Sequence, residues 1–189
     1  MILDYLATVT ALLYVWLAAR DNNLCWFFAA VSTACWAYLS FFEYRLVSDA
    51  LLQIFYFVMA GVGLYAWRQG TQTAAPPIRR MSVREHALVI GISTAAGLAL
   101  GYFFSSVMTS AATYPDALTT AFSISTTFLL VNRRLENWLY WIVIDLAYVG
   151  IYYRQGAILF AALMVVYTAM AAYGYWNWRR ELAAPGSAQ

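Results

Sequence analysis

One hydrophobic stretch carries polar side chains that a lipid-facing helix would not need. The run Glu136-Asn137-Trp138-Leu139-Tyr140-Trp141-Ile142-Val143-Ile144-Asp145 places two tryptophans, an amide and a carboxylate in a segment apolar enough to span a membrane. A charged side chain near mid-membrane costs at least about 2.5–3.5 kcal/mol, and such carboxylates usually face a protein interior or a cavity. The stretch therefore predicts a pocket for a flat, polar and cationic molecule.

Helical spacing places the chemically useful side chains of this stretch on one face. Trp138, Trp141, Asp145 and Tyr148 recur at steps of three or four residues, and such residues share a helix face. Aromatic faces attract cations by roughly 0.5–2 kcal/mol per contact, and Asp145 would supply the opposite charge. Two other interpretations stay open: Trp138 as a membrane-interface residue, and Asp145 as the structural partner of an arginine or a hydroxyl.

Polar and aromatic residues of other segments are expected to join the same pocket. Gln53 and Asn137 can each donate and accept hydrogen bonds, as recognition of an amide or a heterocycle requires. Ser123 belongs to a polar stripe that also contains Asp116 and Thr127. The full set of predicted substrate-binding residues is Trp36, Gln53, Tyr56, Ser123, Asn137, Trp138, Trp141, Asp145, Tyr148 and Tyr167.

Composition assigns the chain to the all-α integral membrane proteins. Of its 189 residues, 63% are hydrophobic and 11% are charged, whereas soluble domains carry about 25% charged residues. A net charge of +2 is too small to indicate nucleic-acid binding. All basic residues are arginines, so the lysine of a P-loop or of a retinal Schiff base is missing. No enzyme motif is found, and with His86 as the one histidine we expect no catalysis, metal or cofactor.

Seven segments are long and apolar enough to cross a bilayer, which takes about 20 residues. They cover residues 2–19, 24–42, 47–67, 86–106, 115–132, 136–153 and 157–178. The first is interpreted as a membrane helix because no basic segment or cleavage site of a signal peptide accompanies it.

The arginines orient these segments. Nine of them fall on one side of the predicted membrane, and only Arg45 and Arg154 fall on the other. Because positive charge stays in the cytoplasm, we expect the N-terminus outside, the C-terminus inside and the long connection 68–85 in the cytoplasm. The expected location is the bacterial inner membrane.

A repeat is hidden in the hydrophobic pattern. At an offset of 111, Tyr56 matches Tyr167, Gly63 matches Gly174 and Trp67 matches Trp178, while Trp26 matches Trp138 at 112. The predicted domains are therefore a first three-helix repeat at 1–70, a linker and linker helix at 71–110, a second repeat at 111–182 and a tail at 183–189. Parallel repeats of this kind are a transporter architecture with the substrate site near mid-membrane.

The chain also resembles the PnuC-type vitamin transporters over nearly its whole length. The resemblance rests on Asp49-Ala-Leu-Leu-Gln53 with Gly63-Leu-Tyr-Ala-Trp67, on Pro115-Asp116-Ala117 and on Glu136-Asn137-Trp138-Leu139-Tyr140-Trp141. It implies a SWEET-like fold of three, one and three helices. It also implies facilitated diffusion of an unphosphorylated vitamin, which a cytoplasmic kinase then traps, and a homotrimer as the oligomeric state.

The resemblance does not identify the vitamin, which must be inferred from a few side chains. Members of the nicotinamide riboside branch place asparagine where Ser32-Thr33 and Asp145 stand here. Since an aspartate among aromatic rings suits a ring cation with an exocyclic amine, thiamine is the predicted substrate. Nicotinamide riboside, which is also cationic, is the alternative. A SWEET-type sugar carrier and a proton-coupled carrier that titrates a membrane aspartate remain further alternatives.

Overall fold

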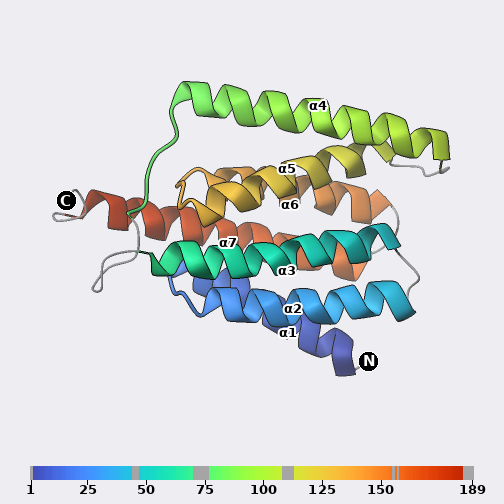
Figure 1. Ribbon diagram of the computed structural model, residues 1–189, viewed down its shortest axis with the longest axis horizontal. Coiled ribbons are helices and arrows are strands. Elements are labelled where there is room, and N and C mark those ends of the chain that lie inside the picture. The colour runs from blue at the N-terminus through green and yellow to red at the C-terminus, as the bar shows by residue number, and fades with distance from the viewer. Residues whose placement is uncertain are drawn as a thin grey trace. The chain divides into compact units, whose positions relative to one another are not determined.

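Each predicted span corresponds to one helix of the computed structural model, which describes residues 2–43, 47–69, 77–107, 113–154, 156 and 158–184. Arg45 and part of the 68–85 connection lie outside these residues. The helices are α1 (Ile2–Ala19), α2 (Cys25–Tyr38) with a π-helical continuation η1 (Leu39–Glu43), α3 (Val47–Arg68), α4 (Val83–Val107), α5 (Thr113–Val131), α6 (Asn137–Arg154) and α7 (Ile158–Ala183). Figure 1 shows their order along the chain.

Two helix ends differ from the prediction by three residues or more, and both have local reasons. Helix α4 begins three residues early because Ser82 and Glu85 cap it reciprocally. The Ser82 amide donates to Glu85 Oε2 at 2.7 Å, and the Glu85 amide donates to Ser82 Oγ at 3.3 Å, which is a capping box. Helix α7 runs five residues further, to Ala183, because no helix breaker comes before Pro185.

Four helical segments of the described chain are long and apolar enough to cross a membrane by length and composition. They are α1, α2 with η1, α3 and α4. Helices α5, α6 and α7 are less apolar, because hydroxyl side chains, Asp145 and many tyrosines replace aliphatic residues in them. Such helices are credible in a bilayer where their polar groups face protein or water.

The helices group into two compact units. The first contains residues 1–77 and 177–189, and the second contains residues 78–176. In the first unit α2 packs against both α1 and α3, and in the second α5 packs against both α4 and α6 (Figure 1). These units come from contacts within the molecule, whereas the predicted domain boundaries come from the sequence repeat and stay a prediction.

Each unit contains the same contact between a tryptophan and a glycine. A Cβ atom added to Gly63 would lie 2.5 Å from the Trp26 ring, and one added to Gly174 would lie 2.8 Å from the Trp138 ring. Both rings are 2% exposed. The repeat inferred from matching tryptophans and glycines therefore corresponds to one packing arrangement made twice.

The turns before α2 and α6 also have the same backbone geometry, at an offset of 112 residues. Asp21 and Arg133 adopt positive φ angles of 56° and 53°. The next residue in each turn donates its amide to a carbonyl five residues back: Asn22 to Leu17 and Arg134 to Leu129, both at 2.9 Å. This bond, with a left-handed residue before it, defines a Schellman motif.

Tryptophans form the core of the first unit at the end where α3 and α7 finish. The Trp26 and Trp67 rings meet edge to face at 5.2 Å, and Trp67 lies 5.8 Å from Trp178. The Trp178 indole donates to the Ala18 carbonyl at 3.2 Å, and Asn177 donates to Ala19 at 3.1 Å. Trp67 and Trp178 are buried, so their position beside arginines does not make them membrane-interface residues.

Candidate functional site

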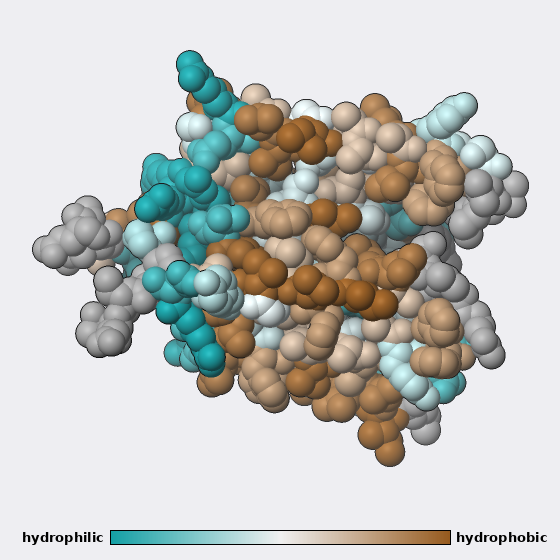
Figure 2. All heavy atoms as spheres, viewed as in Figure 1, coloured by the Kyte–Doolittle hydropathy of each residue, from teal (hydrophilic) through white to brown (hydrophobic). Residues whose placement is uncertain are grey.

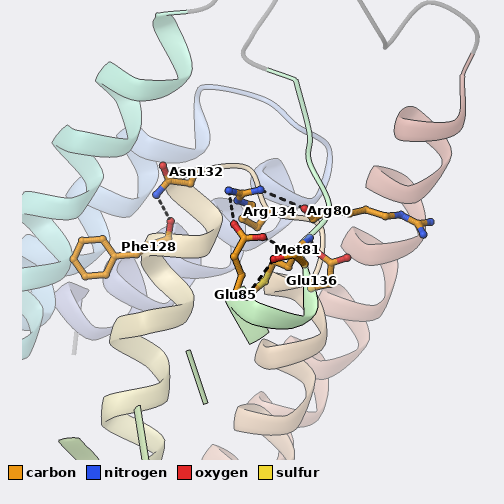
Figure 3. A network of polar contacts seen from close by, with 8 residues as sticks. Arg80, Met81, Glu85, Phe128, Asn132, Arg134 and Glu136 are labelled. Atoms are coloured by element: carbon orange, nitrogen blue, oxygen red, sulfur yellow. Dashed lines mark hydrogen bonds and ion pairs between the residues drawn. The ribbon is translucent and has the colours of Figure 1, made fainter. Parts of the chain in front are cut away.

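A polar network joins the segment before α4 to the turn before α6 (Figure 3). Two backbone bonds pair Arg79 with this turn: its amide donates to the Arg133 carbonyl at 3.0 Å, and its carbonyl accepts from the Leu135 amide at 2.9 Å. The Met81 amide donates to Glu136 Oε2 at 2.8 Å. We call residues 79–82 and 133–136 together the linker clasp. It shows that the first residue of the Glu-Asn-Trp run has a structural partner.

Side chains extend the linker clasp onto α4 and α6. Arg134 forms an ion pair with Glu85 at 2.7 Å and donates to the Arg80 carbonyl at 3.3 Å. His86 Nδ1 lies 2.9 Å from the Tyr140 hydroxyl, and the two rings stack at 5.8 Å. The lone histidine therefore links the first turn of α4 to the first turn of α6.

Asn137, predicted to read the substrate, begins α6 and is fully buried. Its Nδ2 donates to the Arg134 carbonyl at 2.6 Å, so its donor group is occupied by the preceding turn. Its Oδ1 has no hydrogen-bond partner among the described residues. A buried acceptor without a partner is costly, so this oxygen is the part of Asn137 suited to a ligand donor.

The two tryptophans of α6 have different surroundings. Trp138 is buried against Gly174 of α7, which uses one of its faces for packing. Trp141 is half-buried. Of the two, Trp141 retains more of the surface that an aromatic ligand could contact, whereas the first tryptophan of the run serves the helix interface.

Asp145 lies one turn beyond Trp141 on α6 and is 6% exposed. Within the described part of the chain, its carboxylate forms no hydrogen bond and no ion pair. Tyr167 of α7 is close enough to interact with it electrostatically. Tyr148 is half-buried one turn beyond, with its ring 5.7 Å from that of Tyr152. A buried carboxylate beside tyrosines is equipped to bind a cation.

The polar stripe of α5 is mostly satisfied within its own helix. Thr119 Oγ1 donates to the Pro115 carbonyl at 3.0 Å, and Thr127 Oγ1 donates to the Ser123 carbonyl at 2.9 Å. Ser123 is 3% exposed. Thr126, which was not among the predicted residues, is fully buried with no hydrogen-bond partner for its hydroxyl in the described chain.

Three predicted site residues belong to the first unit. Trp36 lies on α2, and Gln53 and Tyr56 lie one turn apart on α3; all three are half-buried. The second unit holds the other seven, of which Tyr167 and Asp145 are near one another. Sequence patterns missed the structural use of Glu136, because nothing in its spacing indicates a partner 55 residues away. They also missed the bond from Asn137 to the carbonyl of Arg134 in the preceding turn.

The pattern of helices and buried polar groups has a counterpart among known proteins. A family model described as nicotinamide mononucleotide transporter matches residues 1–180. The chain belongs to this transporter family. It is accordingly a multi-pass membrane protein of the PnuC vitamin transporter group, as the motifs in α3, α5 and α6 indicated.

Named relatives of this transporter family come from several bacteria. The nicotinamide riboside transporter PnuC of Neisseria mucosa is 25% identical over 92% of this chain and 70% of its own length. PnuC of Escherichia coli is 25% identical over 98% of this chain and 88% of its own. The fold is shared with a crystal structure of the vitamin B3 transporter PnuC, at a TM-score of 0.77 and 23% identity over 96% of this chain and 82% of that one.

These relatives change the order of the predicted substrates. They are named as transporters of nicotinamide riboside, which was the alternative, and do not support the thiamine branch. The signal that favoured thiamine was Asp145, and a carboxylate attracts either vitamin because both carry a permanent ring cation. Charge alone could not separate the two.

Proposed function

We propose that this protein carries nicotinamide riboside across the bacterial inner membrane by facilitated diffusion. The observation that carries the proposal is the match of the family model to residues 1–180, together with relatives that are named nicotinamide riboside transporters. Phosphorylation of the riboside in the cytoplasm would then trap it, because the phosphate adds charge that a membrane pocket does not accept.

The substrate-binding residues that we propose are the ten predicted from the sequence, with Asp145 as the counter-charge for the pyridinium ring. Its burial and its lack of a hydrogen-bond or ion-pair partner in the described chain support this role. Trp141 offers an aromatic surface, and Asn137 Oδ1 is an acceptor for the carboxamide N–H. A phosphate group would be repelled by Asp145, so the riboside should bind better than the mononucleotide.

Thiamine is the second candidate. Asp145 favours it, since a carboxylate can accept a hydrogen bond from the exocyclic amine of the pyrimidine while it neutralises the thiazolium ring. The two candidates differ in the group that the pocket reads beyond the cation: a carboxamide in one and an aminopyrimidine in the other.

Calorimetry on the purified protein separates these substrates. We expect nicotinamide riboside to bind with higher affinity than thiamine, and nicotinamide mononucleotide to bind weakly. Tight binding of thiamine without binding of the riboside would reverse the order of the candidates. Binding of neither vitamin would overturn the proposal as a whole.

Proteoliposomes without a kinase test the transport mode. Facilitated diffusion predicts that labelled riboside equilibrates across the membrane, that excess unlabelled riboside exchanges with it, and that a protonophore changes neither result. Accumulation that collapses with the protonophore would instead indicate proton coupling, with Asp145, Asp116 or Asp49 as the groups to examine.

A further inference from the structure

Three arginines at the start of α4 form an exposed positive surface. Arg79, Arg80 and Arg84 are exposed, and within the described chain their guanidinium groups have no hydrogen bond or ion pair. In Figure 3 the side chain of Arg80 points away from Glu85 and Glu136. We call these three residues the arginine patch.

Nearby acidic groups do not neutralise the arginine patch, because they are engaged elsewhere. Glu85 pairs with Arg134 and caps α4 through the Ser82 amide, and Glu136 accepts from the Met81 amide. The positive charge of the arginine patch is therefore exposed and not neutralised by these two carboxylates.

The backbone holds the patch in a fixed position. Ile78 and Met81, on either side of Arg79 and Arg80, are 6% and 9% exposed. The two bonds between Arg79 and the turn before α6 fix the segment as well. Little backbone freedom would be lost when these arginines bind an anion, which favours binding.

The arginine patch lies where an apolar surface begins. Helix α4 is long and apolar enough to cross a membrane, and its outward residues include Val83, Leu88 and Ile92, which are 84%, 59% and 60% exposed. Figure 2 shows hydrophilic side chains at the start of α4 and hydrophobic ones along it. With this surface in the acyl chains, the arginines lie at the depth of the lipid head groups.

We propose that the arginine patch binds anionic phospholipids through the phosphodiester of the head group. The planar guanidinium matches phosphate oxygens with two parallel hydrogen bonds, and basic groups at a membrane surface attract anionic lipids. The lipid tail lies along the apolar face of α4, which distinguishes this site from one for a soluble phosphate. The site would anchor α4 and the linker clasp to the cytoplasmic leaflet.

Native mass spectrometry of the purified protein tests the proposal with phosphatidylglycerol and phosphatidylcholine. We expect preferential retention of phosphatidylglycerol, and a loss of about tenfold or more in its affinity in the triple variant Arg79→Gln/Arg80→Gln/Arg84→Gln. The matched control is Arg154→Gln, which removes an exposed arginine from the other end of α6 and should leave the affinity unchanged.

A charge-retaining triple variant, with lysine at the same three positions, keeps the test valid if the glutamine variant folds poorly. It should still prefer phosphatidylglycerol to phosphatidylcholine, because lysine is also cationic, but with a lower affinity than the native protein, because lysine cannot form the two parallel hydrogen bonds of a guanidinium. Equal retention of both lipids by the native protein would overturn the proposal. So would inorganic phosphate that displaces phosphatidylglycerol at millimolar concentration, or an Arg154→Gln variant that loses as much affinity as the glutamine triple variant.

Discussion

At the scale of single residues, the charge of Asp145 should favour cationic ligands over neutral ones. Asp145→Asn keeps the size of the side chain and removes the charge. We expect it to weaken the binding of nicotinamide riboside by about tenfold, which corresponds to ~1.4 kcal/mol, because the attraction between the carboxylate and the ring cation is lost. Calorimetry measures this loss.

The matched ligand for that experiment is the reduced form of the riboside, whose dihydropyridine ring is neutral. Asp145→Asn should change the affinity of this ligand little, because its neutral ring has no charge–charge attraction to the carboxylate that the substitution could remove. Equal losses for the charged and the neutral ligand would mean that Asp145 supports the structure instead of the cation.

The second prediction at this scale concerns the stability of variants at Gly63 and Gly174. An alanine at either position would place a methyl group 2.5–2.8 Å from a buried tryptophan ring, and such overpacking typically costs about 1–3 kcal/mol. We expect Gly63→Ala and Gly174→Ala each to lower the Tm of the purified protein, by about 2–4 °C for each kcal/mol.

Neighbouring glycines provide controls for this prediction. A Cβ atom at Gly61 or Gly150 would meet nothing within 4 Å, and alanine favours a helix over glycine by up to about 1 kcal/mol. Gly61→Ala and Gly150→Ala should leave the Tm unchanged or raise it. If all four variants behaved alike, the tryptophan contact would not be what makes Gly63 and Gly174 necessary.

The asymmetry between the repeats is also visible at the residue scale. At the offset of 112 set by the two turns, the position of Asp145 is matched by Thr33, whose hydroxyl donates to the Ala29 carbonyl at 2.8 Å. At this position the first repeat therefore has a hydroxyl that is hydrogen-bonded within its own helix, whereas the second repeat has the carboxylate of Asp145. The sequence could indicate this difference, because both residues are polar in apolar runs, but it could not indicate which hydroxyl is already bonded.

At the scale of elements, the positions of the helices could be predicted from the sequence, but the hydrogen bonds that join the segment before α4 to the turn before α6 could not. Long apolar runs dictate membrane helices regardless of context, so the ends of the helices fall within a few residues of the prediction. The linker clasp depends on backbone groups of residues 79–81 meeting a turn more than 50 positions later. Side-chain types carry little information about such backbone pairing, and Glu136 therefore looked like part of a ligand motif.

The linker clasp gives a prediction about Glu136. Glu136→Ala removes the acceptor of the Met81 amide. Because this hydrogen bond is partly buried, its loss should cost about 1 kcal/mol. The segment should then open more often, so that trypsin cleaves after the exposed Arg79 and Arg80 faster than in the native protein. Glu136→Gln, which retains an acceptor oxygen, should cleave at nearly the native rate.

Glu43→Ala is the control for this experiment, because Glu43 is exposed and lies far from the clasp in the sequence. Its cleavage after Arg79 and Arg80 should match the native protein. Unchanged cleavage in Glu136→Ala would show that the two backbone bonds of Arg79 suffice to hold the segment.

At the scale of the whole molecule, the distribution of arginines predicts the orientation in the membrane. Each unit collects basic residues near one set of helix ends. In the first unit, Arg68 and Arg179 directly follow Trp67 and Trp178 of the tryptophan core, and Arg20 directly follows α1. In the second unit, four arginines belong to the linker clasp, and Arg84 comes shortly after residues 79–82, in α4. Arg154 lies at the opposite end of α6 from the clasp. Since positive charge is retained in the cytoplasm, the linker clasp should face inward and Arg154 outward.

Single cysteines test this orientation in intact cells. Arg154→Cys should react with a membrane-impermeant maleimide added outside, whereas Arg80→Cys should react only after the cells are permeabilised. Both positions are exposed, so a difference in labelling reports the side of the membrane and not burial. The native protein is the blank, because Cys25 is buried and Cys35 is half-buried within α2. External labelling of Arg80→Cys, with none of Arg154→Cys, would reverse the orientation and would place the arginine patch on the outer leaflet.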